Sequence, residues 1–166
     1  AISASGHLML GGCDVTDLAT KYGTPLYVFD EKTIRDVCQE FLREFQSRYR
    51  DTTVIYASKA LTNLAITKLL REEGLGIEIV SGGELASAIA SGIPPNRIYF
   101  HGNNKGRGEL EEAVKCGVGR IVVDNFHELE LLQSVAHSIG RVQDILIRVS
   151  PGVDPHTHTY ITTGTL

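Results

Sequence analysis

Short β-branched segments alternate with helical segments along most of this chain, and that alternation limits the folds it can adopt. Glycines follow the helical segments, at Gly74, Gly92, Gly117 and Gly140, where a helix is expected to end. Strand and helix in strict succession predict a parallel sheet made of βα units. The β-branched segments are TTVIYAS at 52–58, GIEIV at 76–80, RIYFH at 97–101, RIVVD at 120–124 and DILIRV at 144–149.

The spacing of these segments narrows the fold class further. They begin about 21 to 24 residues apart, whereas doubly wound sheets usually vary their connections more. The regular period favours an α/β fold of the (β/α)₈ TIM-barrel type, of which five strands lie in these 166 residues. Such a part alone would leave two sheet edges unpaired.

A different unit precedes the periodic region. Residues 25–29 (PLYVF) predict a strand, and a long helix is predicted from about Glu31, with Asp30 as its N-cap. The apolar residues of that helix recur with a period of about 3.6. They are Ile34, Val37, Cys38, Phe41, Leu42 and Phe45.

Composition excludes several function classes. A net charge of −4 gives no electrostatic reason to expect nucleic acid or an anionic membrane as partner. No apolar run approaches the roughly 20 residues of a membrane span. The first residues, AISASGHLML, lack the features of a signal peptide. A targeting segment that was removed from the protein is left as an alternative. Cys13, Cys38 and Cys116 are far apart, which indicates reduced thiols in a cytoplasmic protein.

A lysine stands where the first periodic strand ends. The active sites of such barrels lie at the carboxyl ends of the strands, and alternation puts Ile55, Ala57 and Lys59 on one face. Ala57 would leave room for a planar ring. Desolvation by a barrel favours the neutral amine, which can form a Schiff base. A solvent-exposed lysine without a role is the alternative.

The other strand ends also carry polar residues. Glu78 is a carboxylate within an apolar strand, and Ser81 with Glu84 fits a helix capping box. His101 opens a polar turn and could either contact a ligand or be satisfied locally. Arg148 in ILIRV needs an anionic partner, either a ligand or a structural ion pair.

Other chemistries find little support in the sequence. His156 and His158 stand two apart, but no third metal ligand is evident nearby, so we predict no metal site. The glycine-containing segments lack the P-loop and Rossmann spacings, and there is no GxSxG nucleophile elbow.

Five segments, in this order, together resemble one enzyme family. They are YGTPLYVFDE, YASKA, IVSGGEL, HGNNK and RVSPGVDPHTHTYITTG. The combination resembles the diaminopimelate decarboxylases, pyridoxal-phosphate (PLP) enzymes of fold type III that are related to ornithine decarboxylase and alanine racemase. The resemblance runs from about Gly11 to Gly164 and would make the chain the N-terminal part of such an enzyme.

The resemblance implies roles for individual residues. Lys59 matches the lysine that holds PLP as a Schiff base, and Ala57 matches a small residue beneath the cofactor. Glu78 stands where relatives usually have aspartate, which lengthens the side chain. His101 and Arg148 match polar groups close to the cofactor ring. Glu84 matches a carboxylate at the barrel mouth, and Ser150 stands where many relatives have asparagine.

The implied activity is the decarboxylation of meso-diaminopimelate to L-lysine by a cytoplasmic homodimer. Residues 1–24 would associate with a C-terminal β-domain, and residues 25–166 would be about five of the eight βα units. Phosphate and ring-nitrogen partners are expected beyond Leu166, so this chain alone should be inactive. The alternatives are another basic substrate, such as ornithine, arginine or carboxynorspermidine, and a PLP-binding barrel without catalysis.

Overall fold

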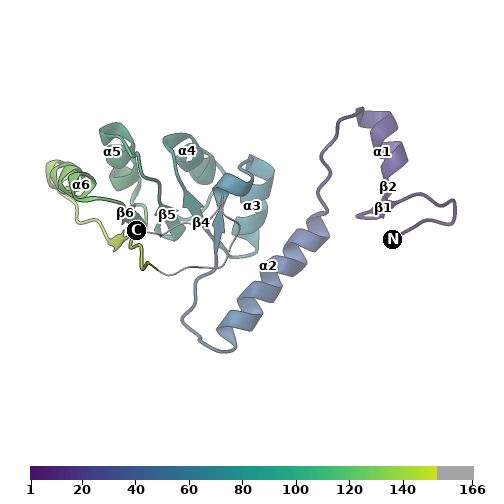
Figure 1. The fold of residues 1–166 in the computed structure, drawn as a ribbon, viewed down its shortest axis with the longest axis horizontal. Coiled ribbons are helices and arrows are strands. Elements are labelled where there is room, and N and C mark those ends of the chain that lie inside the picture. The colour runs from purple at the N-terminus through teal and green to yellow at the C-terminus, as the bar shows by residue number, and fades with distance from the viewer. Residues whose placement is uncertain (153–166) are drawn as a thin grey trace. The chain divides into compact units, whose positions relative to one another are not determined.

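Five parallel strands form the sheet that the periodic sequence predicts (Figure 1). Each strand pairs with the next one along the chain, in the order β3-β4-β5-β6-β7. Consecutive order is typical of a β/α barrel, since a doubly wound sheet reverses its order at a switch point. The strands are β3 (Ile55–Ala57), β4 (Gly76–Ile79), β5 (Ile98–Phe100), β6 (Arg120–Val123) and β7 (Ile145–Ile147). The predicted partial barrel is confirmed, with shorter strands than the sequence segments.

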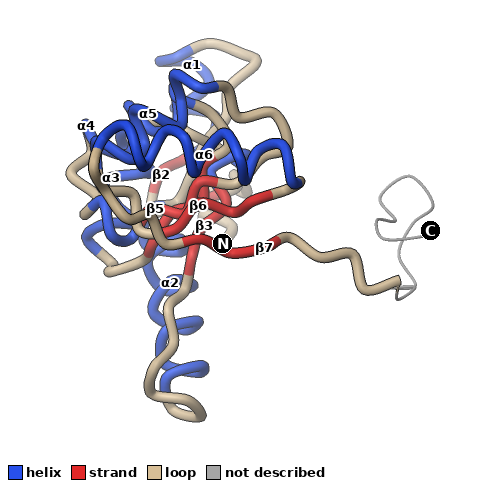
Figure 2. The backbone as a smooth tube through the Cα atoms, turned by 90° about the vertical axis from the view of Figure 1, so that its left-hand side faces the viewer, coloured by secondary structure: helices blue, strands red, loops and turns tan. Residues whose placement is uncertain are grey.

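A helix follows each of the first four strands of this sheet. They are α3 (Leu64–Glu72), α4 (Gly82–Ala90), α5 (Arg107–Cys116) and α6 (Phe126–Ile139). Short 3-10 turns, η1 (Ser58–Ala60) and η2 (Pro95–Arg97), lie after β3 and before β5. Figure 1 shows α4, α5 and α6 side by side, and Figure 2 shows the strands in red with these helices in blue along them.

The core lies between the helices and one face of the sheet. Strand residues of one parity are buried there, whereas Glu78, Tyr99 and Val122, of the other parity, are only half-buried. The second face corresponds to the interior of a barrel. The buried strand residues are Ile77, Ile79, Ile98, Phe100, Ile121 and Val123, and they pack with Leu85, Leu110, Val114 and Leu132 of the helices.

The structure is a computed structural model that describes residues 1–152, and it divides into two compact units. The first unit contains residues 1–54 and 72–75, and the second contains 55–71 and the residues from 76 on. The sequence placed a boundary between residues 24 and 25 instead. The helix after that point belongs to the first unit, because Gln39 donates hydrogen bonds to the backbone and side chain of Glu73.

The first unit contains a short antiparallel hairpin and two helices. The elements are β1 (Met9–Leu10), β2 (Cys13–Asp14), α1 (Val15–Tyr22) and α2 (Glu31–Gln46). The predicted long helix and its N-cap are confirmed, since the Asp30 carboxylate accepts hydrogen bonds from the backbone of Lys32 and Thr33. The hydrogen bond from the Thr33 hydroxyl is the main cause that lowers the pKa of Asp30.

The strand predicted at 25–29 is wrong. These residues have no regular secondary structure, and Tyr27 is 89% exposed. The segment has the β-branched and aromatic residues of a strand, but no strand among the described residues pairs with it. Strand propensity alone does not supply the hydrogen bonds of a ladder.

The three cysteines are free, as the sequence predicted. Cys38 is buried in α2, and this burial raises the pKa of its thiol. A buried thiol of raised pKa is a packing residue rather than a nucleophile. Within residues 1–152, no helix combines the length and apolar character that crossing a membrane requires.

Backbone segments approach each other closely at the amino ends of the strands. Gly119 donates its N–H to the carbonyl oxygen of Pro95 at 2.9 Å. A Cβ atom at Gly119 would lie 2.2 Å from the carbonyl oxygen of Asn96, which no side chain can occupy without a backbone shift. Glycine at this position therefore permits the junction between η2 and β6.

We expect Gly119→Ala to lower the free energy of unfolding by about 1–3 kcal/mol, as overpacking does. Gly108→Ala is the matched control, because a Cβ atom there meets nothing within 4 Å and the residue lies in α5. The control should be neutral or more stable by up to about 1 kcal/mol. Urea unfolding of both variants measures the difference, and equal midpoints would contradict the close approach.

Candidate active site

The residues predicted for the site lie at the carboxyl ends of the parallel strands. Ala57 is the last residue of β3, and Lys59 lies in the turn η1 that follows. Glu78 is within β4, while His101 and Arg148 come directly after β5 and β7. Because parallel strands end at the same edge of a sheet, the fold gathers these residues at one edge, as such barrels require.

Glu78 and His101 are in direct contact through their side chains. The Nδ1 atom of His101 lies 2.9 Å from Oε1 of Glu78, and each side chain is 29% exposed. The backbone N–H of His101 donates to the carbonyl of Ile79 at 2.8 Å, which fixes the histidine at the strand end. Its Nε2 atom is buried and has no partner among the described residues. One nitrogen of the imidazole is thus held by Glu78, and the other is buried without a partner.

Ala57 and Glu78 are direct neighbours in the sheet. Their Cα atoms are partners in the β3–β4 register, and Glu78 is in turn the partner of Tyr99 in β5. Both residues therefore share the face of the sheet that the helices do not cover. This placement agrees with the predicted location for both residues.

Lys59 occupies the predicted position, but its surroundings differ from the prediction. Its side chain is exposed, whereas Ser58 beside it is buried. The sequence predicted an amine that a barrel desolvates, and the five strands described surround only part of such an interior. The position of Lys59 at the edge is therefore established, whereas its desolvation is not provided by residues 1–152.

Arg148 forms an ion pair with Asp124, the residue that directly follows strand β6. The Nη1 atom of Arg148 lies 2.8 Å from Oδ1 of Asp124, and the two side chains are 48% and 21% exposed. The cap of α6 is Asn125, whose Oδ1 accepts from the N–H of Glu128 at 2.9 Å. The sequence left either a ligand or a structural ion pair as the anionic partner of Arg148, and the ion pair is present.

Ser81 and Glu84 cap helix α4, with one difference from a capping box. The Ser81 hydroxyl accepts from the N–H of Glu84 at 3.3 Å, as predicted. The Glu84 carboxylate accepts from the N–H of Val80 at 2.6 Å rather than from the cap residue itself. Glu84 is therefore engaged in closing the β4–α4 turn.

The sequence did not single out Lys105 and Glu128, which form a buried ion pair behind this edge. Nζ of Lys105 lies 2.8 Å from Oε1 of Glu128. A lysine in a polar turn usually points to water, so residue type alone gave no signal. Its neighbour Phe100, whose ring centroid lies 5.9 Å from Nζ, comes from a buried strand.

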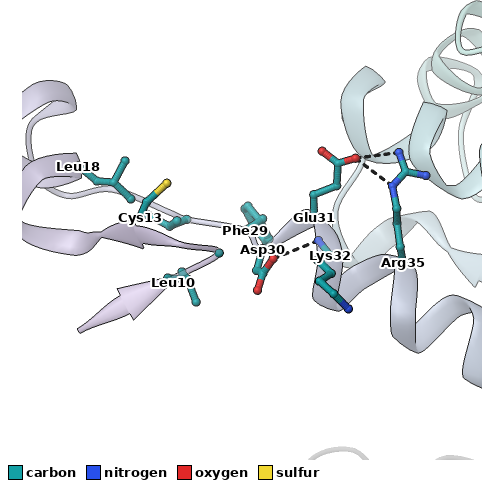
Figure 3. A pocket seen from close by; sticks show the side chains of 10 residues that line it. Leu10, Cys13, Leu18, Phe29, Asp30, Glu31, Lys32 and Arg35 are labelled. Carbon is teal, nitrogen blue, oxygen red and sulfur yellow. Dashed lines mark hydrogen bonds and ion pairs between the residues drawn. The ribbon is translucent and has the colours of Figure 1, made fainter. Parts of the chain in front are cut away.

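Two cavities differ in whether a predicted site residue lines them. A small one of about 160 Å³ lies at the ends of β6 and β7, where Asp124, Phe126 and Arg148 line it. A larger one of about 570 Å³ lies in the first unit, where Leu18, Phe29 and Asp30 line it (Figure 3). None of the predicted site residues lines the larger cavity.

No group of three metal-ligating side chains occurs in the part of the chain described. His156 and His158, the pair considered for metal, lie outside the described residues. The edge instead combines an amine, a carboxylate–imidazole pair and a guanidinium. These groups suit an anionic ligand that carries a carbonyl group, because an amine can add to the carbonyl and a guanidinium binds anions.

We expect Arg148→Gln to change the free energy of unfolding by less than about 1 kcal/mol, since exposed ion pairs contribute little. Thermal unfolding of the variant beside Asp124→Asn measures this. A much larger loss from either variant would show that the pair stabilises the fold, and would weaken the case for Arg148 as a ligand-binding residue.

The chain matches known proteins along nearly its whole length. It is 51% identical over 159 residues to diaminopimelate decarboxylase of Bacillus subtilis (strain 168), an alignment that covers 96% of this chain and 36% of that protein. The structure is similar to diaminopimelate decarboxylase from M. jannaschi, with a TM-score of 0.84, 35% identity and coverage of 95% of this chain and 37% of that one.

A second solved structure is that of the Helicobacter pylori diaminopimelate decarboxylase complexed with L-lysine. It has a TM-score of 0.82 and 36% identity, and the match covers 92% of this chain and 38% of that one. The chain thus spans little more than a third of the length of these relatives. Residues 31–166 match the model of the pyridoxal-dependent decarboxylase, pyridoxal binding domain. The chain therefore belongs to the pyridoxal-dependent decarboxylase family.

Proposed function

We propose that the protein to which this chain contributes uses PLP to decarboxylate meso-diaminopimelate, with L-lysine and CO₂ as products. One relative named diaminopimelate decarboxylase is 51% identical to this chain over 159 residues, and the structure of another was solved in complex with L-lysine. The observation that carries the proposal within this structure is Lys59, an exposed primary amine at the same sheet edge as the Glu78–His101 pair.

The residues at the edge fit PLP. Lys59 supplies the amine that the aldehyde of PLP requires, and Ala57 is small enough to leave space for a ring. The buried, unpartnered Nε2 atom of His101 is a polar group that a ring substituent could satisfy. When bound, PLP supplies the electron sink that makes loss of the α-carboxylate feasible.

The side chains of this chain would bind, orient and move protons. Lys59 would bind the cofactor covalently and, once the substrate amine replaces it, could carry a proton as a free amine. Glu78 would fix the ring orientation of His101 through Nδ1, so that Nε2 stays directed to the ligand. Arg148 would bind an anionic group, with Asp124 keeping its guanidinium in place.

Two narrower statements also belong to this proposal. We infer that the active protein is a cytoplasmic homodimer, on the resemblance of the whole chain to that family. The net charge of −4 and pI of about 5.9 support small molecules, rather than nucleic acid or an anionic membrane, as binding partners.

We expect Lys59→Arg in the intact protein to abolish borohydride-trapped PLP and to lower turnover at least about 100-fold, because arginine cannot replace the amine as nucleophile and proton carrier. Mass spectrometry of the reduced peptide measures the adduct. Lys68→Arg is the matched control, since Lys68 is also exposed and lies on the adjacent helix α3. An adduct that persists in Lys59→Arg would refute the assignment of Lys59.

Substrate identity needs a separate measurement. CO₂ release from meso-diaminopimelate should exceed that from ornithine, arginine and carboxynorspermidine in kcat/KM. A preference for one of the other three would support a related decarboxylase instead. Bound PLP whose absorbance no amino acid changes would support a PLP-binding barrel without catalysis.

A further inference from the structure

Lys105 places a charged group in the interior of the second unit. Its side chain is 1% exposed and that of Glu128 is 5% exposed. Besides the contact with Glu128, its Nζ atom donates to the carbonyl of Gly102 and, at 2.9 Å, to the carbonyl of Val122. Two N–H donors of the ammonium group are thus paired with backbone carbonyls, and the Glu128 carboxylate lies at ion-pair distance, with its Oε1 atom buried and without a hydrogen-bond partner among the described residues.

A buried ion pair is by itself weak evidence for a role in stability. Taking two charges out of water is costly, and a well-packed apolar pair of the same volume is often as stable. The pair instead fixes the position of backbone groups. Lys105 donates to the carbonyls of Gly102 and Val122, and Glu128 accepts from the N–H of Asp124. Those backbone groups belong to the ends of the strands that carry the candidate site.

On one side the pair fixes the loop after β5. Gly102 has a φ of +100° and lies so close to the end of β4 that a Cβ atom would be 3.3 Å from the carbonyl of Val80. Lys105 holds the carbonyl of this same residue, Gly102. The tight turn therefore constrains His101, the preceding residue, whose buried Nε2 atom has no partner among the described residues.

On the other side the pair fixes the loop after β6. The Oε2 atom of Glu128 accepts from the N–H of Asp124 at 3.4 Å. Asp124 in turn forms the ion pair with Arg148 after β7. Contacts thus run without interruption from the loop of His101, through Lys105, Glu128 and Asp124, to Arg148.

We propose that Lys105 and Glu128 are positioning residues, which hold His101 and Arg148 in the arrangement that binds PLP. This inference rests on the function proposed above. Neither residue contacts the cofactor in this scheme, because both side chains are buried behind the edge. They act through the backbone of 101–105 and through Asp124.

The decisive variant is Lys105→Met/Glu128→Gln in the intact protein. It removes both charges together, so that neither is left buried alone, and the new amide oxygen at position 128 can still accept from the N–H of Asp124. Lys105→Arg is a second variant that keeps the charge, but its planar guanidinium cannot reproduce the placement of the ammonium between the carbonyls of Gly102 and Val122. Lys115→Met is the control, because Lys115 is 62% exposed and lies 3.9 Å from Glu111 in a surface pair of α5.

Without PLP, the double variant should still fold and unfold cooperatively, at a lower temperature than the unchanged protein, because the carbonyls of Gly102 and Val122 lose their donor. Its Kd for PLP, titrated by the visible absorbance of the bound cofactor, should rise about tenfold or more, as misplacement of site groups implies. Hydrogen exchange should accelerate in the peptide that contains 101–105. Lys105→Arg should weaken PLP binding in the same direction, and Lys115→Met should change none of the three.

Unchanged PLP affinity and loop exchange in either folded variant would overturn the positioning role. Failure of both variants to fold beside a folded control would also count against it, by showing that the pair is a requirement of the fold. If the unchanged protein forms no PLP adduct at Lys59, the proposed function itself fails, and the positioning role with it.

Discussion

Parallel pairing of consecutive strands is the constraint on which the rest of the structure depends. It places the carboxyl ends of β3 to β7 at one edge, and therefore brings together side chains that are up to about 90 residues apart in the chain, from Lys59 to Arg148. No single residue of the site would reveal a function alone. The sheet converts five separate strand ends into one surface with an amine, a carboxylate, an imidazole and a guanidinium.

Much of the fold of the second unit could be predicted from the sequence. Hydrophobic periodicity and the glycines that end helices are both local signals, which do not depend on distant parts of the chain. They located the five strands and the α-helices α3 to α6 described in the second unit, and Asp30 located the start of α2. The segment 25–29 could not be predicted in the same way. Its residues favour a strand, but a strand also needs a partner, and pairing is a property of distant parts of the chain.

For the candidate site, too, features set by neighbouring residues could be predicted, whereas contacts between distant residues could not. Positions at strand ends followed from the sequence, as for Ala57, Lys59 and Glu78, whereas partners across strands did not. The pairing of Arg148 with Asp124, and the burial of Lys105 against Glu128, depend on residues far away along the chain. Charged residues in loops look alike in a sequence, and only packing separates the exposed pair from the buried one.

The close approach at Gly119 has a consequence for how this family can change. It lies at the amino ends of the strands, where backbone touches backbone and no side chain can be added. The opposite ends carry the loops of the candidate site, in which exposed side chains such as Lys59 can be exchanged without moving the backbone. Substitutions at the carboxyl ends of the strands can therefore change which molecule the site recognises. At the amino ends, any side chain at position 119 would force the backbone to shift.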